Sequence, residues 1–171
     1  RVYTDTIPVK PMRWTDSMTF PQFDPTLGIL TRVEITLTGG ITGSTSYTNQ
    51  VNAVTQVSID IPANLRLQSP NNTLLNAGGT IFSFTENVGP FASNARTFFG
   101  TVANSAAYTT QPNLLPFIGF GQITTPVTAT SSFIAGGDVG NFDFSVRTTA
   151  DATGVVRYTY AIPEIAIKKF T

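Results

Sequence analysis

Few residues in this chain could do chemistry, because histidine and cysteine are both absent. Without them the chain cannot form a His/Cys zinc site, a thiol nucleophile, a Ser-His-Asp triad or a disulfide. Its 10 Asp and Glu residues remain as acid–base groups. Most enzyme classes lose their usual general base in such a chain. The composition therefore predicts that this protein is not an enzyme.

Three of the acids deserve a chemical interpretation. Asp5 and Asp16 could supply the two carboxylates of a glycoside hydrolase, although a chain with this many acids always offers some pair. Asp24 lies before Pro25 and close to Gly28. We expect its carboxylate to accept backbone N–H groups in a turn, with a catalytic acid as the weaker alternative.

A glycine-rich stretch carries three oxygen ligands, Asp138, Asn141 and Asp143. Calcium takes roughly six to eight oxygen ligands in proteins. The spacing lacks the Asp/Asn ladder and the closing Glu of an EF-hand loop. We expect ordinary turn chemistry here, with a weak calcium site as the alternative, and we predict no cofactor.

Five aromatic residues could form a platform for a sugar. In an all-β protein such side chains more often pack in the core or across strands. Both interpretations stay open for Trp14, Tyr47, Tyr108, Tyr158 and Tyr160.

Charge excludes several kinds of partner. Lys and Arg total 10, Asp and Glu total 10, and only 12% of the residues are charged. A nucleic-acid binder needs a basic patch, and so does a polybasic protein of the membrane surface. No apolar run approaches the roughly 20 residues that a membrane-spanning helix requires. We therefore expect no nucleic acid as a partner and no membrane span in this chain.

The elements that must position these residues are predicted to be strands. The chain has 28 Thr and 13 Phe but only 3 Lys and 3 Glu, which favours pleated strands over surface helices. Apolar and polar residues alternate around Val33, Ile35 and Leu37. The following Gly39-Gly40 predicts a two-residue hairpin turn. A similar alternation over residues 57–61 is expected to stop at Pro62.

Later segments continue the alternation. Residues 114–123 form an apolar run that is predicted to be a buried or bulged strand and not a helix. Residues 142–146 and 156–162 predict two strands joined by a hairpin loop at 150–154. Roughly nine or ten short strands predict an all-β fold. We expect one domain over residues 1–171, an antiparallel β-sandwich of jelly-roll or Ig-like type with extended terminal strands.

The two terminal segments, residues 1–12 and 163–171, allow two interpretations. Each could complete its own sheet as an edge strand, which its prolines permit. Alternatively, one could leave its domain and add a strand to a neighbouring subunit, as in donor-strand complementation. The N-terminal segment is the preferred donor. Its apolar side chains would then form the inter-subunit strand: Val2, Tyr3, Ile7 and Val9.

Short stretches along nearly the whole chain resemble one bacterial family. They cover residues 3–8, 14–17, 23–33, 65–67, 73–75, 115–119, 121–132, 142–146 and 155–160. Together they resemble the bacterial surface domain known as the choice-of-anchor E domain. The family consists of secreted proteins that end in one of several C-terminal sorting signals.

This resemblance implies export and a cell-surface or matrix location, and it implies no catalytic residues. The chain departs from the family after Tyr160, where Pro163-Glu164 has no second proline to complete a Pro-Glu-Pro signal. Anchoring by that route is therefore not expected. A subunit that assembles through its own ends would need no such anchor.

We therefore expect a secreted structural protein of a bacterial cell surface. It would be a subunit of a pilus-like filament or matrix, a homo-oligomer joined by strand donation between copies. Other surface proteins or a polysaccharide are further candidate partners. The alternative is a monomeric binding module that recognises a polysaccharide or another surface ligand.

Overall fold

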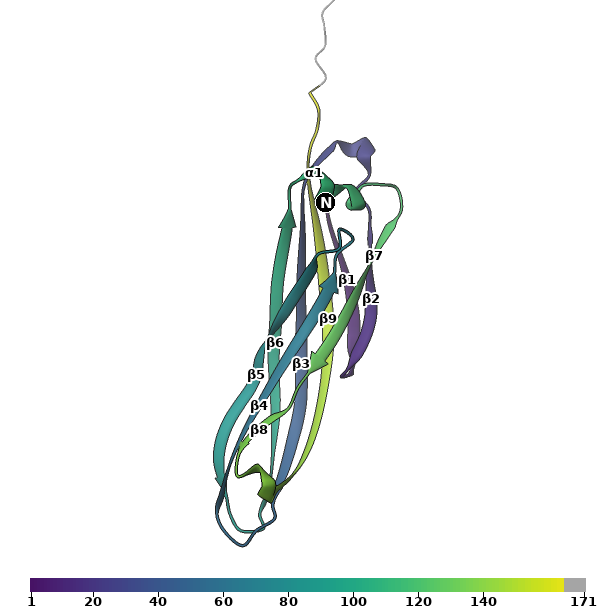
Figure 1. The fold of residues 1–171 in the computed structure, drawn as a ribbon. Helices are drawn as coiled ribbons and strands as arrows, with labels where there is room; N and C mark the ends of the chain where they lie inside the picture. Colours follow the sequence, from purple (N-terminus) through teal and green to yellow (C-terminus); the bar gives the residue numbers. More distant parts are fainter. Residues whose placement is uncertain (165–171) are drawn as a thin grey trace, which may run out of the picture.

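The computed structural model describes residues 1–164 as an elongated sandwich of two β-sheets (Figure 1). Its strands, in chain order, are β1 (Val2–Pro11), β2 (Trp14–Pro21), β3 (Ile29–Asn49), β4 (Thr55–Gln68), β5 (Leu74–Val88), β6 (Ser93–Tyr108), β7 (Gln122–Ser131), β8 (Ile134–Gly137) and β9 (Phe142–Ala161). The short helices are η1 (Pro25–Leu27), α1 (Gln111–Leu114), η2 (Leu115–Phe117) and η3 (Val139–Asn141). None of these helices is long and apolar enough to cross a membrane.

All strand pairs in the two sheets are antiparallel. One sheet has the order β1-β9-β3-β6, and the other has the order β2-β7-β4-β5, with β8 also paired to β4. Strand β4 pairs with β8 along residues 57–60 and with β7 along residues 63–67. The predicted all-β antiparallel sandwich is confirmed.

Strands β1 and β2 are edge strands of the two different sheets and flank only part of the sandwich, and the turn that joins them lies about halfway down the molecule in Figure 1. Pairing of β1 with β9 stops at Pro11 opposite Thr149, and pairing of β2 with β7 stops at Trp14 opposite Ala129. We call the part flanked by β1 and β2 the wide half. The remainder, which holds β8 and residues 142–148 of β9, is the narrow half.

Alternating side chains from the facing sheets form the core. Val33, Ile35 and Leu37 are fully buried, as the sequence predicts. The core divides into two clusters that follow the two halves. The wide half is packed mainly with aliphatic side chains. The narrow half is packed around Tyr47, Phe98 and Phe142, with other aromatic rings partly exposed.

Two predicted turns are wrong, because β3 runs through Gly39-Gly40 and β9 runs through residues 150–154. These small residues let the sheets approach each other closely. A Cβ on Gly39 would lie 2.1 Å from Leu65 Cδ1, and one on Gly154 would lie 2.5 Å from Met18 Sδ. Glycine inside a strand thus marks close packing here and not a turn.

The prediction for Pro62 is also wrong, since β4 continues past it to Gln68. The proline is tolerated at a point where the pairing of β4 with β5 shifts by one residue. Its carbonyl oxygen accepts a 3.0 Å hydrogen bond from Ser132 N. A proline without an N–H fits where the ladder is interrupted in this way.

Residues 114–123 were predicted to form a strand, and this prediction is wrong too. They contain the end of α1, all of η2 and only the first residues of β7. Leu114 and Phe117 turn inward from these helical residues and are buried in the wide half. At the chain ends, residues 1–12 form β1 and the turn after it, and Pro163 and Glu164 are not in a strand. The remainder of the predicted C-terminal strand, residues 165–171, lies outside the described residues.

Candidate functional site: a sheet edge and a polar hollow

Strand β1 holds all four residues predicted to join subunits, and in this structure it pairs with β9 of its own chain. Neighbouring residues of a strand point to opposite faces. Tyr3 and Ile7 accordingly point inward, and Ile7 is only 3% exposed. Val2 faces solvent and is 54% exposed. Val9 is 58% exposed because the pairing of β1 with β9 shifts between Ile7 and Lys10, which interrupts the alternation. The four residues thus contribute to two faces of the strand, and only Ile7 is buried in the core.

A few further contacts hold β1 in place. The N-terminal ammonium donates to Tyr158 O at 2.9 Å, and Thr19 N on β2 donates to Asp5 Oδ2 at 2.7 Å. Lys10 and Asp16 form an ion pair between β1 and β2. Hydrogen bonds from Lys10 and then from Ser17 N lower the pKa of Asp16. Each contact joins β1 to the wide half.

Asp5 and Asp16, the two carboxylates considered for glycoside hydrolysis, each join β1 to β2. Asp5 Oδ2 accepts the hydrogen bond from Thr19 N, and Asp16 forms the ion pair with Lys10. Both acids thus connect the two strands, and their pairing for hydrolysis stays the alternative.

In the narrow half, beyond the end of β1, one edge of β9 has no neighbouring strand among the described residues. Residues 142–148 pair with β3 on one side. Within residues 1–164, no strand pairs with them on the other side. Their inward side chains include Phe144 and Val146, which are only partly buried. The sequence predicts this strand, but it does not reveal the open edge, because the edge depends on where β1 ends.

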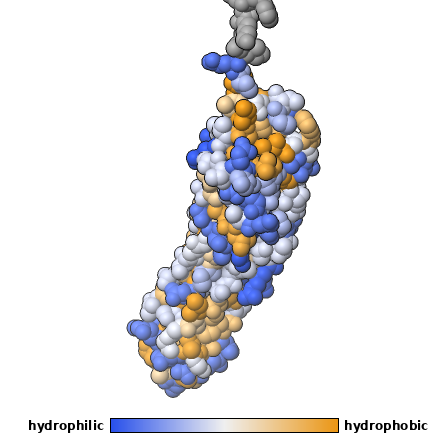
Figure 2. Space-filling model, turned by 45° about the horizontal axis from the view of Figure 1, so that its top comes forward, coloured by the Kyte–Doolittle hydropathy of each residue, from blue (hydrophilic) through white to orange (hydrophobic). Residues whose placement is uncertain are grey.

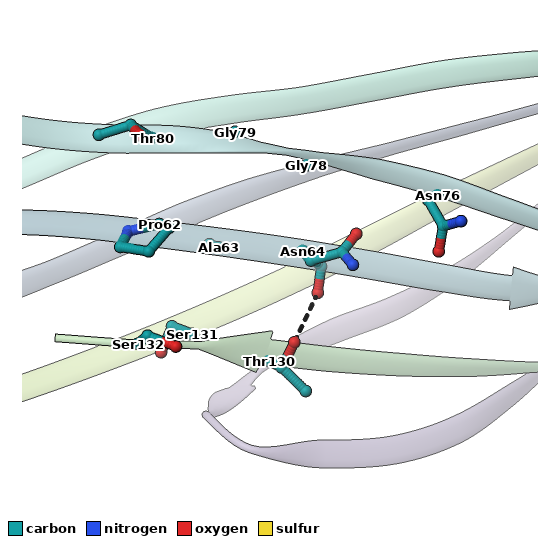
Figure 3. Close-up of a pocket in the computed structure, with 10 residues that line it drawn as sticks. All are labelled: Pro62, Ala63, Asn64, Asn76, Gly78, Gly79, Thr80, Thr130, Ser131 and Ser132. Atoms are coloured by element: carbon teal, nitrogen blue, oxygen red, sulfur yellow. Dashed lines mark hydrogen bonds between the residues drawn. The ribbon is translucent and has the colours of Figure 1, made fainter. Parts of the chain in front are cut away.

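A polar hollow lies on the outer face of the other sheet, where β4 changes partner (Figure 3). It has a volume of about 510 Å³ and is lined by Pro62, Ala63, Asn64, Asn76, Gly78, Gly79, Thr80, Thr130, Ser131 and Ser132. Thr130 Oγ1 donates to the backbone oxygen of Asn64 at 3.5 Å. The side-chain oxygen Asn64 Oδ1 is buried without a hydrogen-bond partner.

This hollow offers hydroxyl and amide groups and carries no charged side chain in its lining. Such groups can hydrogen-bond a neutral polar ligand. Gly78 keeps the space beside Asn64 open, since a Cβ there would lie 3.0 Å from Asn64 Oδ1. Sequence reasoning missed this site because its residues come from three strands and resemble ordinary strand and turn residues.

The five aromatic residues considered for a sugar platform lie in the core. Trp14, Tyr47, Tyr108 and Tyr158 are buried, and Tyr160 packs against the wide-half core. Burial raises the pKa of Tyr158, whose hydroxyl donates to Pro21 O at 2.9 Å. These side chains do not form an exposed platform, and the packing interpretation is confirmed.

The remaining polar candidates are found in turns. Asp24 Oδ1 accepts hydrogen bonds from Thr26 Oγ1 at 2.6 Å and Thr26 N at 2.8 Å, which lower the pKa of Asp24. This is the predicted turn role. Asp138 precedes η3, and Asp143 Oδ2 accepts from Gln50 Nε2 at 3.1 Å. Across the described part of the chain, no three acidic side chains gather as metal ligands.

Apolar surface lies towards both ends of the elongated body on the face shown in Figure 2. Exposed apolar side chains in the connections at the end of the wide half are Leu115, Phe120 and Ile162. Those in the loops at the end of the narrow half include Val54 and Phe91. Both tips of the sandwich therefore offer apolar contacts.

Comparison with known proteins does not identify a family. No family model matches the chain, and no curated protein matches it. Similar solved structures include a chain of infectious bursal disease virus strain Gx, with 13% identity, a TM-score of 0.26 and coverage of 94% of this chain and 37% of the viral one. This chain therefore spans much less than the full length of the viral chain.

Two proteins of Bacillus thuringiensis are also similar. A non-toxic crystal protein shares 9% identity over 95% of this chain and 85% of its own, with a TM-score of 0.31. The toxin parasporin-2 shares 15% identity over 93% of this chain and 69% of its own, with a TM-score of 0.27. At these low TM-scores, none of the three proteins indicates a function for this chain.

Proposed function

We propose that this protein is an extracellular structural subunit of a bacterial surface, which assembles into a filament or matrix by exchanging β1 between copies. The single observation that carries the proposal is the position of β1. It is an edge strand bonded to one neighbour, and Ile7 is its only core side chain with almost no exposure. An edge strand can leave its sheet with less disruption than a central one.

Exchange would cost little once the strand has been released. A β1 donated to a second copy would make the same backbone bonds with β9 that it makes within its own chain. The connection between β1 and β2, residues 12–13, would extend to bridge the two copies. If each copy donates to the next, the contact is head-to-tail and need not close, so a fibre grows.

The charge of the chain supports close packing of identical copies. Its formal net charge is zero, so self-repulsion between subunits is small. Export to the cell surface is expected from the resemblance to the choice-of-anchor E domain. Antibody labelling of intact producing cells tests that location, and labelling only after lysis would contradict it.

A disulfide that locks β1 to its own β9 tests the exchange. Thr6 lies opposite Thr153, both point away from the core, and the chain has no cysteine of its own. We expect the variant Thr6→Cys/Thr153→Cys, oxidised while dilute, to form no filaments after concentration. Electron microscopy and sedimentation would show filaments for the reduced protein only.

A matched control disulfide should leave assembly intact. Thr48 and Ser93 pair between β3 and β6, with their hydroxyl oxygens 2.7 Å apart. Oxidised Thr48→Cys/Ser93→Cys should still assemble, because neither strand is exchanged. Filament formation by the oxidised Thr6→Cys/Thr153→Cys protein would refute the proposal.

The polar hollow favours a second candidate function, a binding module for a neutral polysaccharide. Its uncharged donors and acceptors, together with the unpartnered Asn64 Oδ1, support this alternative. Titration with a panel of soluble neutral glycans would test it. Asn64→Ala should abolish any binding, whereas Asn52→Ala, at an exposed position in the loop before β4, should leave it unchanged. No binding by the parent chain would exclude this candidate.

A further inference from the structure

Alternate residues of β9 direct their backbone N–H and C=O groups towards its open edge. Tyr158 N donates to Arg1 O, and Met12 N donates to Thr148 O, so even-numbered residues of β9 direct their backbone groups towards β1. Because the direction of the backbone groups repeats every two residues along a strand, residues 142, 144 and 146 direct their N–H and C=O groups towards the open side. Within residues 1–164, no strand occupies that side. The edge can therefore accept one further strand.

The side chains of this edge are complementary to themselves. Asp143, Ser145 and Arg147 face outward, and Phe144 and Val146 lie between them on the inward face. If two copies of the edge pair in antiparallel fashion about Ser145, Asp143 of each copy lies opposite Arg147 of the other. The backbone N–H and C=O groups of Phe144 in one copy then bond with those of Val146 in the other copy. These are the groups that point towards the open side of β9.

We propose that residues 143–147 of β9 are a dimerisation edge, at which two copies of this chain pair about a two-fold axis through Ser145. The opposite charges at positions 143 and 147 fix the register, because they fall in pairs without backbone hydrogen bonds, where side chains lie closest. The two narrow halves then share a continuous sheet. This contact is isologous and therefore does not depend on β1 exchange.

Dimerisation would also cover apolar side chains that the single copy leaves exposed. Phe144 packs on Phe133 with ring centroids 5.1 Å apart, and both rings are partly exposed. Ile134 on β8 is 54% exposed at the corresponding edge of the other sheet. Side chains on the same face of two paired strands meet across the pair, so Phe144 of one copy meets Val146 of the other.

There is also room for the partner at the upper end of the edge. A hollow of about 500 Å³ lies there, lined by residues 11–13 at the turn between β1 and β2, Ser131 and residues 146–149 of β9. In the proposed register, the partner's residues before Phe142 reach this point. The hollow therefore leaves space for the chain that leads into the partner's β9.

Charge reversal tests the register. The full chain is used in the oxidised Thr6→Cys/Thr153→Cys background, in which β1 exchange is blocked, and its dimer dissociation constant is measured by sedimentation equilibrium. Asp143→Arg or Arg147→Asp alone places like charges opposite each other twice per dimer. We expect either change to raise the dissociation constant about tenfold or more. The double variant Asp143→Arg/Arg147→Asp restores opposite charges and should return the constant close to its starting value.

Arg66→Asp on the outer face of β4 makes the same charge change elsewhere and should have no effect. A locked chain that stays monomeric would overturn the proposed dimer. So would single variants that associate as well as their parent. If the single variants lose association and the double variant does not regain it, the edge receives another segment of the partner, and the proposed register is wrong. None of these outcomes depends on whether β1 is exchanged.

Discussion

The wide and narrow halves of the sandwich fill the space between the two sheets in different ways. In the wide half, β1 and β2 flank the sheets, and small residues let the facing layers approach closely. Gly39 lies against Leu65 there, and Gly154 lies against Met18. In the narrow half the flanking strands are missing, and aromatic side chains fill the space. Phe82 and Phe98 stack with centroids 5.4 Å apart, for example.

This difference explains why the narrow half carries an open edge. Its aromatic rings pack on one another, but Phe144 and Val146 stay partly exposed where a fourth strand would lie. The wide half shows what such a strand supplies, since β1 places Ile7 over the same edge of β9. One long strand, β9, is therefore an interior strand of its sheet in the wide half and an edge strand in the narrow half.

Truncation of one buried isoleucine in each half should expose the difference most strongly. Ile35 in the wide half and Ile59 in the narrow half are both fully buried. We expect Ile35→Ala to lower the free energy of unfolding by about 4 kcal/mol and Ile59→Ala by about 2 kcal/mol, because the partly exposed rings around Ile59 can relax into the space. Denaturant unfolding measures both. Equal losses would mean that the two cores are equally rigid.

Amide hydrogen exchange should separate the two parts of β9. The N–H groups of Gly154 and Val156 point towards β1, whereas those of Phe144 and Val146 point towards the open side. In the dilute monomer, we expect exchange at 144 and 146 to be at least about a hundredfold faster, because no partner strand protects them. Residue-resolved NMR measures this ratio. Similar rates at all four sites would contradict the open edge.

A polar cluster around Glu86 joins three strands of the narrow half. Glu86 accepts hydrogen bonds from Tyr47, Arg96 and Asn94. Burial acts to raise the pKa of Glu86, but these hydrogen bonds outweigh it and the pKa is lowered. An acid whose pKa is lower in the folded state stabilises the fold above its unfolded-state pKa, and this contribution is lost as pH falls.

Glu86→Gln should therefore lower the free energy of unfolding at neutral pH by about 1 kcal/mol. The difference from the parent chain should shrink as the pH falls below 4.5, the ordinary pKa of this glutamate. Unfolding titrations at several pH values measure it. Glu34→Gln, in an exposed ion pair with Arg32, is the control and should change stability by less than about 0.5 kcal/mol. A difference that stays constant with pH would contradict the cluster's role.

The strands themselves could be predicted from the sequence, because each inner face is buried and alternation records that burial. Val33, Ile35 and Leu37 illustrate this. The turns were harder, since a glycine looks the same in a hairpin and in a tightly packed strand. Gly39 is explained by Leu65 and by the backbone of Asp151, both remote from it in sequence. The prediction for 114–123 failed for a similar reason, because a nearly continuous apolar run fits a strand buried on both faces as well as helical turns. Leu114 and Phe117 are three residues apart, a spacing that puts both on the inward face of the helical turns.

The candidate site could be predicted only in part. The pattern of apolar residues and prolines at the N-terminus predicts an edge strand, and β1 is one. The open edge at residues 142–148 could not be predicted, because it depends on where the pairing of β1 with β9 ends. The hollow around Asn64 likewise depends on a change of strand partner at Pro62. Both features arise from register, which a single sequence does not specify.

The most direct test of the central claim is to determine which chain supplies the β1 that pairs with each β9. The Thr6→Cys/Thr153→Cys protein would be assembled under reducing conditions, then oxidised and separated on a non-reducing denaturing gel. Exchange predicts a ladder of covalent multimers, because each disulfide then joins two chains, whereas Thr48→Cys/Ser93→Cys should run as a monomer. If the assembled Thr6→Cys/Thr153→Cys protein also ran as an oxidised monomer, each β1 would have stayed in its own sheet and the account would be wrong.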